Sequence, residues 1–367
     1  MRFLGCRQEE RLPFSITIKR SENRIMKMIE VGGMAQNLQG DLARLQGLPI
    51  RKEKLAVRRM AKRETIPVFF ASDNNYLPFL DVAISSLVKN RSRKYDYALH
   101  ILHSGIDGEK AERIMRHAKG GVSIRFINVE SHVNKLADCF NLRDYYTPAI
   151  YYRLFIVGMF PQYKKAVYLD CDTVILGDVS ELYRENLGRN LIGAVADGVV
   201  QGVPAFKKYT KDALGVDGEK YFNSGVIVMN LDGMRKMGFY DAFCSTLRQY
   251  RFRVAPDQDC LNVLCKGRVH YFPEAWNRMP QGGDSVGEAK LIHYNLAQKP
   301  WHYDGIRYED YFWAQAKESP FYDEIVGHKQ SFTAEMAKRD EEGGKALLAL
   351  AEQEAKRKDC YVRTARK

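Results

Sequence analysis

From Pro67 onward, short apolar runs alternate with stretches of helical periodicity, and this alternation limits the folds open to the chain. Residues 67–71 form an apolar run that stops at a polar turn, and apolar residues then recur at helical spacing between Leu77 and Val88. Later segments with the pattern of strands are 97–102, 123–129, 166–169, 191–197 and 221–231, and residues 107–118 have the pattern of a helix. Strands that alternate with helices of about 10–15 residues are typical of βαβ units. The sequence therefore predicts an α/β fold with a mostly parallel sheet, whose ligands lie beyond the carboxyl ends of the strands.

The net charge of +12 is concentrated at the two ends of the 367-residue chain. Residues 1–64 carry 15 Lys and Arg against 7 Asp and Glu, and residues 328–367 carry 10 against 7, so the body between them is close to neutral. Nucleic-acid binding requires a basic face on the folded body, and the neutral body argues against it. Basic ends are typical of solvated tails or of segments that contact an anionic membrane surface, and both interpretations stay open.

The patterns divide the chain into four segments. We expect a basic, poorly ordered leader over residues 1–64, a main α/β domain over 65–303, an aromatic extension over 304–327 and a basic, helix-prone tail over 328–367. Seven scattered cysteines without a C-x-x-C pair indicate reduced thiols in the cytoplasm. No segment has the pattern of an export signal or of a membrane span. We therefore expect a cytoplasmic protein whose contact with the inner face of a membrane is at most peripheral.

The strongest chemical signal is the pair Asp170 and Asp172, which directly follows the apolar run 166–169. Residues i and i+2 of an extended backbone lie on the same side, so both carboxylates can reach one cation. Carboxylate oxygens suit Mg²⁺ or Mn²⁺, and such ions usually keep positions open for phosphate oxygens. Two surface aspartates without a ligand are the alternative.

His293 follows a short apolar run and precedes Lys299 by six residues. A histidine in this position is commonly a buried or rim residue with no ligand. The nearby lysine favours a second interpretation, because a metal ligand beside a fixed cation suits a diphosphate leaving group. An imidazole ligand would also shift the metal preference from Mg²⁺ towards Mn²⁺.

The turn after the first strand is a second candidate for ligand binding. Asp73 and Asn75 lie in this turn, between the strand and the helix that begins near Leu77. They could hydrogen-bond a base or a ribose, and the N-terminus of a helix also attracts anions. Simple capping of the helix is the alternative.

Four other polar residues adjoin or interrupt apolar segments. Asp257 and Gln258 begin an apolar helical segment, where an acidic residue also interacts favourably with the helix dipole. Asn223 lies inside an otherwise apolar strand and needs hydrogen-bond partners there. Asp197 ends the strand 191–197 in a similar position.

Taken together, these segments resemble glycosyltransferase family 8, a group of retaining enzymes with the GT-A fold. The resemblance covers roughly residues 66–303 and rests on segments that occur in the family's order: FFASDNNY, YYRLFI, VYLDCDTVILGDVSELY, GAVAD, GEKYFNSGVIVMNL, DQDCLN and LIHYNLAQKPW. The family includes galactosyl- and glucosyltransferases of bacterial lipopolysaccharide. The resemblance implies a GT-A-type nucleotide-binding sheet, mostly parallel and flanked by helices, with a small C-terminal extension.

The same resemblance implies roles for particular residues. The implied metal ligands are Asp170, Asp172 and His293. The implied donor-binding residues are Ala71, Asp73 and Asn75 at the base and ribose, Lys299 at the diphosphate, and Arg153 and Asn223. The implied catalytic residues are Asp197, near the donor sugar and the acceptor, Asp257, and Gln258, which lies behind the anomeric carbon. One position departs from the family pattern, since Leu296 stands where the family usually has a glycine that lets the backbone approach phosphate.

The implied reaction is transfer of glucose or galactose from a UDP-sugar to a glycan or lipid-linked saccharide acceptor, with Mn²⁺ or Mg²⁺ as cofactor. The implied setting is synthesis of bacterial cell-surface polysaccharide or lipopolysaccharide. Retention of the anomeric configuration requires either a covalent intermediate or attack on the face of the sugar from which the leaving group departs. The absence of a well-placed carboxylate pair favours the second route. A non-catalytic UDP-sugar-binding protein is the alternative function, and the presence of both aspartates, His293 and Lys299 argues against it. A nucleotidyltransferase is disfavoured because the sequence has no Gly-rich, basic phosphate loop near its N-terminus.

Overall fold

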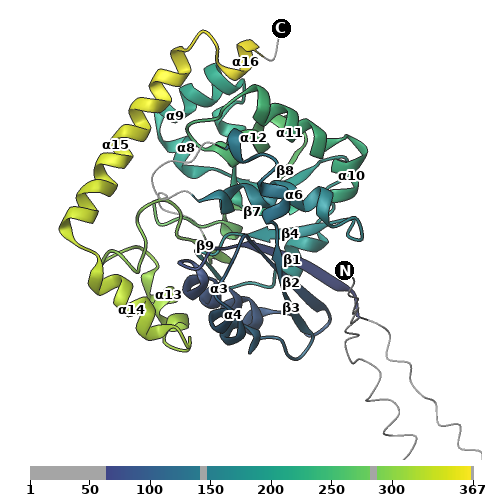
Figure 1. Cartoon of the computed structure of the whole chain (residues 1–367), viewed down its shortest axis with the longest axis vertical. Helices are drawn as coiled ribbons and strands as arrows, with labels where there is room; N and C mark the ends of the chain where they lie inside the picture. The colour runs from purple at the N-terminus through teal and green to yellow at the C-terminus, as the bar shows by residue number, and fades with distance from the viewer. Residues whose placement is uncertain (1–62, 141–146, 282–286, 365–367) are drawn as a thin grey trace, which may run out of the picture. The chain divides into compact units, whose positions relative to one another are not determined.

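A seven-stranded sheet forms the centre of the chain in a computed structural model, which describes residues 63–140, 147–281 and 287–364 (Figure 1). The predicted leader over residues 1–64 lies outside the described residues, apart from its last two. The strands of the large sheet are β1 (Thr65–Ala71), β2 (Asp96–His103), β3 (Val122–Asn128), β4 (Ala166–Leu169), β6 (Ile192–Ala196), β7 (Phe222–Met229) and β8 (Val269–Tyr271). A second sheet pairs β5 (Thr173–Ile175) with β9 (Leu291–His293).

Helices connect the strands and continue after the last of them. Those in the first half are α3 (Leu77–Asn90), α4 (Gly108–Met115), α5 (Glu130–Val133), α6 (Tyr152–Met159) and α7 (Ser180–Arg184). Those in the second half are α8 (Gly198–Gly202), α9 (Pro204–Tyr209), α10 (Leu231–Lys236), α11 (Phe239–Gln249), α12 (Pro256–Leu264), α13 (Glu309–Ala316), α14 (Tyr322–Ser331), α15 (Ala334–Lys356) and α16 (Tyr361–Thr364). Short 3₁₀ or π turns are η2 (Ala137–Cys139), η3 (Pro148–Tyr151), η4 (Thr210–Leu214), η5 (Gly218–Lys220) and η6 (Glu274–Trp276).

The strand order of the large sheet is β3-β2-β1-β4-β7-β6-β8. β1 pairs in parallel with β2 and β4, β2 with β3, and β6 with β8, whereas β7 runs antiparallel to both of its neighbours. The predicted mostly parallel α/β sheet is therefore confirmed, with β7 as the exception. Because the order reverses at β1, the carboxyl ends of β1 and β4 meet at the point where sheets of this kind bind ligands. The antiparallel β7 begins at the same edge.

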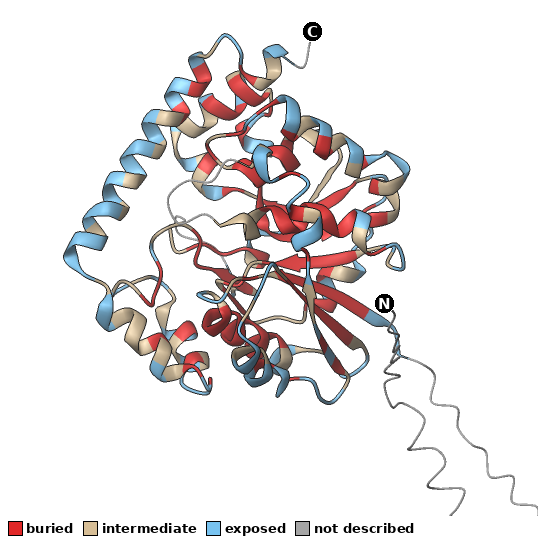
Figure 2. Ribbon diagram, in the orientation of Figure 1, coloured by how far each residue is buried: buried red, intermediate tan, exposed pale blue. Residues whose placement is uncertain are grey.

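Side chains on both faces of the large sheet are buried, which explains why its strands read as continuous apolar runs. In β1, Phe69 packs into one hydrophobic cluster, while Val68 and Phe70 point to the other face and join a second cluster. In β7, Ile227 and Val228 divide between the two clusters in the same way. Burying a side chain of this size stabilises a fold by about 1.5–3 kcal/mol. Figure 2 shows the result, with buried strands inside and exposed helix surfaces outside.

The aromatic residues after β9 pack against the outer side of α3. The rings of Phe79 in α3 and Trp301 stack with their centroids 3.9 Å apart, and Phe312 and Phe321 are buried in the same cluster. A fully buried carboxylate, Asp81, strengthens this contact. It accepts hydrogen bonds from three side chains, namely Arg116 and His117, which directly follow α4, and Ser319, which lies between α13 and α14. The rings of the predicted aromatic extension are thus partly used in packing.

The helix α15 runs from the end of α14 along the edge of the described unit and packs against α9 and η4 (Figure 1). Its C-terminal half is held by Glu354, a buried carboxylate that pairs with Arg253 at 2.8 Å and with Arg357 at 2.9 Å. Its N-terminal half is held by Asp340, which accepts a hydrogen bond of 2.9 Å from the Tyr303 hydroxyl. The helix is therefore fixed at two separate points.

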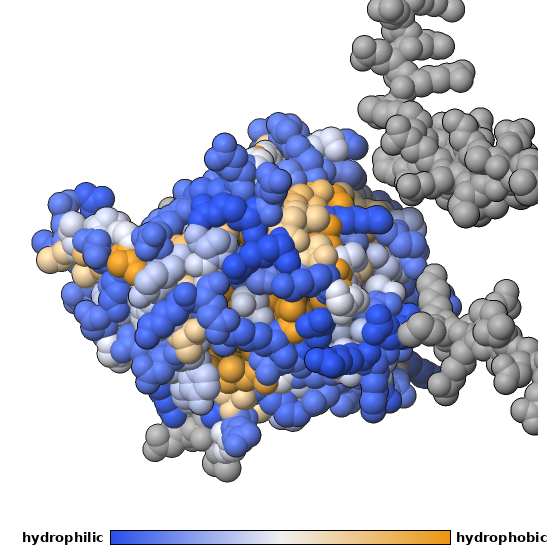
Figure 3. Space-filling model, turned by 90° about the horizontal axis from the view of Figure 1, so that it is seen from below, coloured by the Kyte–Doolittle hydropathy of each residue, from blue (hydrophilic) through white to orange (hydrophobic). Residues whose placement is uncertain are grey.

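The surface of the unit is mainly hydrophilic on the face seen from below, where apolar residues form small separate groups (Figure 3). Among the helices formed by the described residues, none has the length and hydropathy that a membrane crossing requires. The cysteines of the described residues are all free thiols.

Candidate active site

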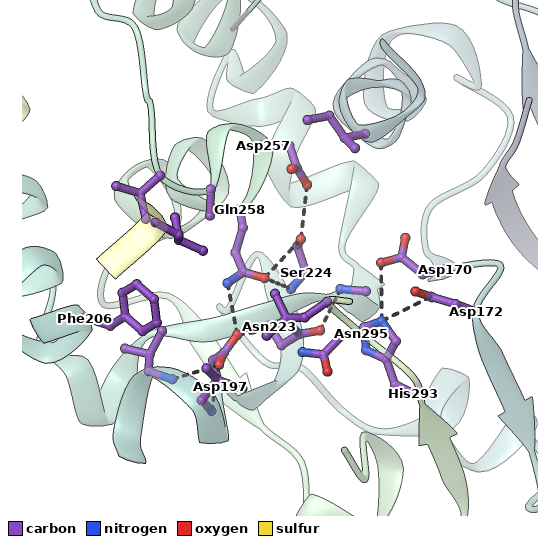
Figure 4. A pocket seen from close by; sticks show the side chains of 18 of the residues that line it. Asp170, Asp172, Asp197, Phe206, Asn223, Ser224, Asp257, Gln258, His293 and Asn295 are labelled. Carbon is purple, nitrogen blue, oxygen red and sulfur yellow. Dashed lines mark hydrogen bonds and ion pairs between the residues drawn. The ribbon is translucent and has the colours of Figure 1, made fainter. Parts of the chain in front are cut away.

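A cavity of about 580 Å³ opens at the edge of the sheet where β1 and β4 end and β7 begins. Of the residues singled out in the sequence, all but Asn75 line this cavity. Asn75 lies in the turn before α3 and is exposed. Figure 4 shows the two aspartates of the D-x-D pair and His293 on one side of the cavity, and Gln258, Asn223 and Asp197 next to them.

Pairing between distant strands brings the three predicted metal ligands together. In the small sheet His293 lies opposite Thr173, and the amide of Tyr294 donates to the carbonyl of Asp172 at 2.9 Å. His293 Nε2 is 3.2 Å from Asp172 Oδ1 and 3.7 Å from Asp170 Oδ2. One ligand atom from each of the three residues falls within 4.8 Å of the others. This spacing suits a single cation.

A chain of buried amides fixes the orientation of the histidine ring. The backbone amide of Gly225 donates to Asn223 Oδ1 at 3.0 Å, and Asn223 Nδ2 donates to Asp197 Oδ2 at 3.1 Å. Asn277 Nδ2 donates to the same Asn223 oxygen at 2.9 Å, so Asn277 Oδ1 faces His293 Nδ1, also at 2.9 Å. An amide oxygen only accepts hydrogen bonds, so Nδ1 of His293 carries the hydrogen. Nε2 is therefore the nitrogen that faces the carboxylates.

The three residues fit a divalent cation. Asp172 Oδ1 is buried and makes no hydrogen bond, although it faces His293 Nε2. Oxygen and imidazole nitrogen donors together suit Mn²⁺. Burial would raise the pKa of Asp172, but the positive charge of Lys299 outweighs burial and holds this pKa well below its usual range. Asp172 is thus ionised and able to bind a cation at neutral pH.

Gly225 leaves the space that these ligands occupy. It lies opposite Asp170 in the pairing of β7 with β4, where the amide of Asp170 donates to the Gly225 carbonyl at 2.8 Å. A Cβ at this position would lie 2.3 Å from His293 Cε1 and 2.5 Å from Asp170 Oδ2. Only a residue without a side chain leaves both ligands where they are.

Arg153 is buried and binds two of the carboxylates. Its guanidinium lies 2.8 Å from Asp170 and 3.2 Å from Asp257, and it also donates to the Ser224 carbonyl at 2.6 Å. Burial would lower the pKa of Arg153, but the charges of Asp170 and Asp257 outweigh burial and raise it, so the side chain stays cationic. Arg153 lines the cavity and holds its carboxylates in place.

Gln258 is held by hydrogen bonds at both ends of its amide. Its Oε1 accepts from the Ser224 backbone amide at 2.9 Å, and its Nε2 donates to Asp197 Oδ2 at 3.0 Å. Asp197 in turn caps α8 by accepting from the amides of Val199 and Val200. The cavity-facing amide of Gln258 therefore has one fixed orientation.

The remaining predicted residues lie at the rim and floor of the cavity. Asp73 accepts hydrogen bonds from the amides of Asn75 and Tyr76 in the turn before α3, whose own N-cap, Tyr76, makes no side-chain capping bond. Lys299 is buried and contacts Asp172 and the carbonyl of Tyr294. Leu296 has φ 57, in the left-handed region that favours glycine, so the backbone there is compatible with the glycine of the family pattern.

Asp259 lies behind the cavity and is buried between two tyrosines. The hydroxyls of Tyr221 and Tyr209 donate to its two oxygens at 2.6 and 2.7 Å. Burial raises the pKa of Asp259 to about 7, although both hydroxyls oppose the shift. In the unfolded chain this carboxyl ionises near its ordinary value of about 3.9.

We expect this carboxyl to reduce stability as pH rises from about 4 to 7, because the folded protein keeps the proton that the unfolded chain has released. Asparagine at position 259 cannot ionise. The free energy of unfolding of Asp259→Asn minus that of the unmodified protein should therefore increase by roughly 1.4 kcal/mol for each pH unit across that range. Urea unfolding at pH 5, 6 and 8 measures the difference. Parallel pH profiles for the two proteins would contradict the shifted pKa.

Sequence patterns missed several residues that shape the cavity. Ser224 and Gly225, which directly follow Asn223 in a segment that resembles the family, and Asn277, which no pattern marks, orient the predicted residues. The hydroxyl of Tyr168 donates to Asp170 at 2.9 Å. In the sequence, the only sign of this role of Tyr168 is its position in the strand that directly precedes the two aspartates. Side chains of α15 also line the cavity, from a segment that the sequence presents as a basic tail.

Comparison with known proteins is consistent with this geometry. The family model of glycosyl transferase family 8 matches residues 67–305. The lipopolysaccharide 1,2-glucosyltransferase of Escherichia coli K12 is 29% identical over 67% of this chain and 76% of its own length. General stress protein A of Bacillus subtilis is 24% identical over 66% of this chain and 90% of its own length. The crystal structure of the galactosyltransferase LgtC, 27% identical, superposes with a TM-score of 0.63 over 72% of this chain and all of its own. The chain has the GT-A fold and belongs to glycosyl transferase family 8.

Proposed function

We propose that the protein is a retaining transferase that moves glucose or galactose from a UDP-sugar to a glycan acceptor. The observation that carries this proposal is the meeting of Asp170, Asp172 and His293 in one cavity, next to Lys299 and Gln258. The similarity to a lipopolysaccharide glucosyltransferase and to a galactosyltransferase supports hexose as the transferred group. It also supports a role in cell-surface polysaccharide synthesis.

Each part of the cavity has a distinct task in this reaction. The turn at Ala71 and Asp73 binds the uridine, and Lys299 neutralises the diphosphate. The aspartates and His293 would hold a divalent cation, which when bound would supply positive charge that stabilises the departing diphosphate. Mn²⁺ is the ion that the donor set favours. Asp197, Asn223 and Asp257 position the hexose.

The geometry favours attack of the acceptor oxygen on the same face of the donor sugar from which UDP departs. Asp197 and Asp257 are already bound, Asp197 by Asn223 and Gln258 and Asp257 by Arg153 and Ser224. The hydrogen bonds to both oxygens of Asp197 and the ion pair of Asp257 with Arg153 lower the nucleophilicity of these carboxylates, and the amide of Gln258 is a poor nucleophile. The acceptor oxygen therefore bonds to the anomeric carbon as the bond to the diphosphate breaks. Its proton passes to the departing phosphate oxygen.

Donor hydrolysis tests the proposal without knowledge of the acceptor. Transferases of this kind release sugar slowly to water, so UDP-glucose, UDP-galactose and GDP-mannose are incubated with the protein and Mn²⁺, and free nucleotide is measured. Hydrolysis of one UDP-sugar and not of GDP-mannose is the expected result. Binding of UDP without any turnover would instead identify a non-catalytic UDP-sugar-binding protein.

Asn277→Ala should weaken Mn²⁺ binding roughly 10- to 100-fold, because groups that orient a metal-binding histidine typically contribute that much. The variant removes the acceptor that faces His293 Nδ1 and lets the ring turn. Titration followed by electron paramagnetic resonance of free Mn²⁺ measures the change. Asn277→Asp keeps an acceptor at this position and should retain more of the affinity. Equal affinity in the Asn277→Ala and unmodified proteins would show that the amide does not position the ring.

Gln258→Ala should lower kcat and leave UDP affinity nearly unchanged. The amide lies beside Asp197 and Ser224, among the residues that we assign to the sugar rather than to the nucleotide. An interaction formed mainly in the transition state affects kcat in this way. Hydrolysis rates and calorimetry with UDP separate the two effects. Parallel losses of kcat and UDP affinity would place Gln258 in the nucleotide pocket.

A further inference from the structure

The cavity extends beyond the predicted donor residues to a second end with a different character. Figure 4 shows Phe206 on the side away from the metal-ligand cluster, with Gln258 and Asp197 between them. The described side chains at this end are mostly apolar: Val199, Val203, Phe206, Val254, Leu347 and Leu348. Since the donor occupies the other end, the acceptor must enter here if the proposed function holds.

One face of α15 forms the outer wall of this end. Glu341, Gly344, Lys345 and Leu348 line the cavity, at the spacing of neighbours on one side of a helix. The matched family segment ends at residue 305, before α15 begins. The wall is therefore supplied by a part of the chain outside the matched segment.

Gly344 keeps this wall open. A Cβ added to Gly344 would meet no atom within 4 Å, so a side chain there would extend into the cavity. Glycine weakens the interior of a helix, and Gly343 precedes Gly344 in the same turn. The fixed points at Asp340 and Glu354 hold the helix in place on either side of the pair.

The polar groups that the described residues place at this end are already paired. Glu341 and Lys345 bind each other at 2.5 Å, the Thr210 hydroxyl donates to the Lys207 carbonyl, and the Tyr209 hydroxyl donates to Asp259. Although the α15 residues are exposed, the described residues at this end offer a sugar ring few unpaired polar groups, so it is a less favourable site for sugar hydroxyls than for an apolar group. An alkyl or aromatic group would gain about fourfold in affinity for each buried methylene.

We propose that this end is an acceptor subsite that takes an apolar group attached to the acceptor sugar, with the Gly344 face of α15 as its wall. The accepting sugar lies beside Gln258, and its alkyl or aryl group lies between Phe206 and Leu348. The apolar group then determines which acceptors are used. This inference rests on the proposed function only for the direction from which the acceptor enters.

The test compares glycosides that share a sugar and differ in the attached group. Methyl, phenyl and octyl β-glucosides and β-galactosides, below their critical micelle concentrations, are titrated by calorimetry against the full chain, with and without Mn²⁺ and UDP. We expect the octyl or phenyl compound to bind at least about tenfold more tightly than the methyl compound of the same sugar. A preference for octyl indicates a lipid-like group, and a preference for phenyl an aromatic one.

Two variants and one control connect this preference to α15. Gly344→Leu fills the space and Leu348→Asp places a charge there, so each should abolish the preference over the methyl compound. Ala346→Leu adds the same side chain at an exposed position outside the cavity lining and should retain it. Equal binding of all three glycosides by the unmodified chain, or a preference that survives in both variants, overturns the proposal. Failure to bind UDP counts against the proposed function alone, because the titrations without UDP still test the apolar end.

Discussion

Asp172→Ala should lower donor hydrolysis on the order of 1000-fold, since a bound cation contributes several kcal/mol to the departure of a charged leaving group. The variant removes the carboxylate that faces both His293 and Lys299. EDTA should abolish turnover of the unmodified protein, and added Mn²⁺ should restore it. The hydrolysis rate and the Mn²⁺ affinity are both measured.

Asp232→Ala provides the matched control for this loss. Asp232 is a partly exposed residue of α10 that pairs with Lys236 and does not line the cavity. Its removal should change neither hydrolysis nor metal binding. Near-normal turnover by Asp172→Ala, still sensitive to EDTA, would assign the cation to other residues.

Gly225→Ala should reduce Mn²⁺ affinity and donor hydrolysis at least about 100-fold, although the change adds a single methyl group. The new Cβ cannot coexist with His293 Cε1 at 2.3 Å and Asp170 Oδ2 at 2.5 Å, so one or both ligands must move. Positioning errors of about 1 Å can cost this much activity. Mn²⁺ titration and hydrolysis are measured together with thermal unfolding, because β7 is a core strand.

Gly202→Ala tests whether glycine replacement in general has this effect. Gly202 has no atom within 4 Å of the position that a Cβ would take, and it does not line the cavity. This variant should bind Mn²⁺ and hydrolyse the donor normally. A folded Gly225→Ala protein with unchanged Mn²⁺ affinity would contradict the close approach that the geometry shows.

The strands, and their place in one buried sheet, could be predicted from the sequence because both faces of the sheet are buried. Continuous apolar runs such as 67–71 and 166–169 then appear in the sequence and end at the polar residues of the site. The direction of β7 could not be predicted, since the run 221–231 reads the same in a parallel or an antiparallel strand. The apolar run that ends at His293 forms β9. Its pairing with β5 could not be predicted, because β5 is only three residues long and has no pattern of its own.

The orientation of the side chains within the site could not be predicted from the sequence either. The residue types at Asp170, Asp172 and His293 indicate a cation, but the hydrogen on His293 depends on Asn277, which no spacing connects to it. The role of α15 was hidden for a similar reason. Its polar composition predicts a helix, whereas its partners α9 and η4 lie far away in the sequence.

The pairing of β5 with β9 also determines when the site can form during synthesis. Thr173 and His293 are opposite each other in the small sheet but are separated in the chain by most of the second half of the domain. Contacts between such distant segments form slowly, because a long loop must close first. A ribosome that has released only the first strands leaves Asp170 and Asp172 without their imidazole partner and without β7. The nascent chain therefore carries an unfinished metal centre until β9 leaves the exit tunnel, and sugar-transfer activity should arise only after that release.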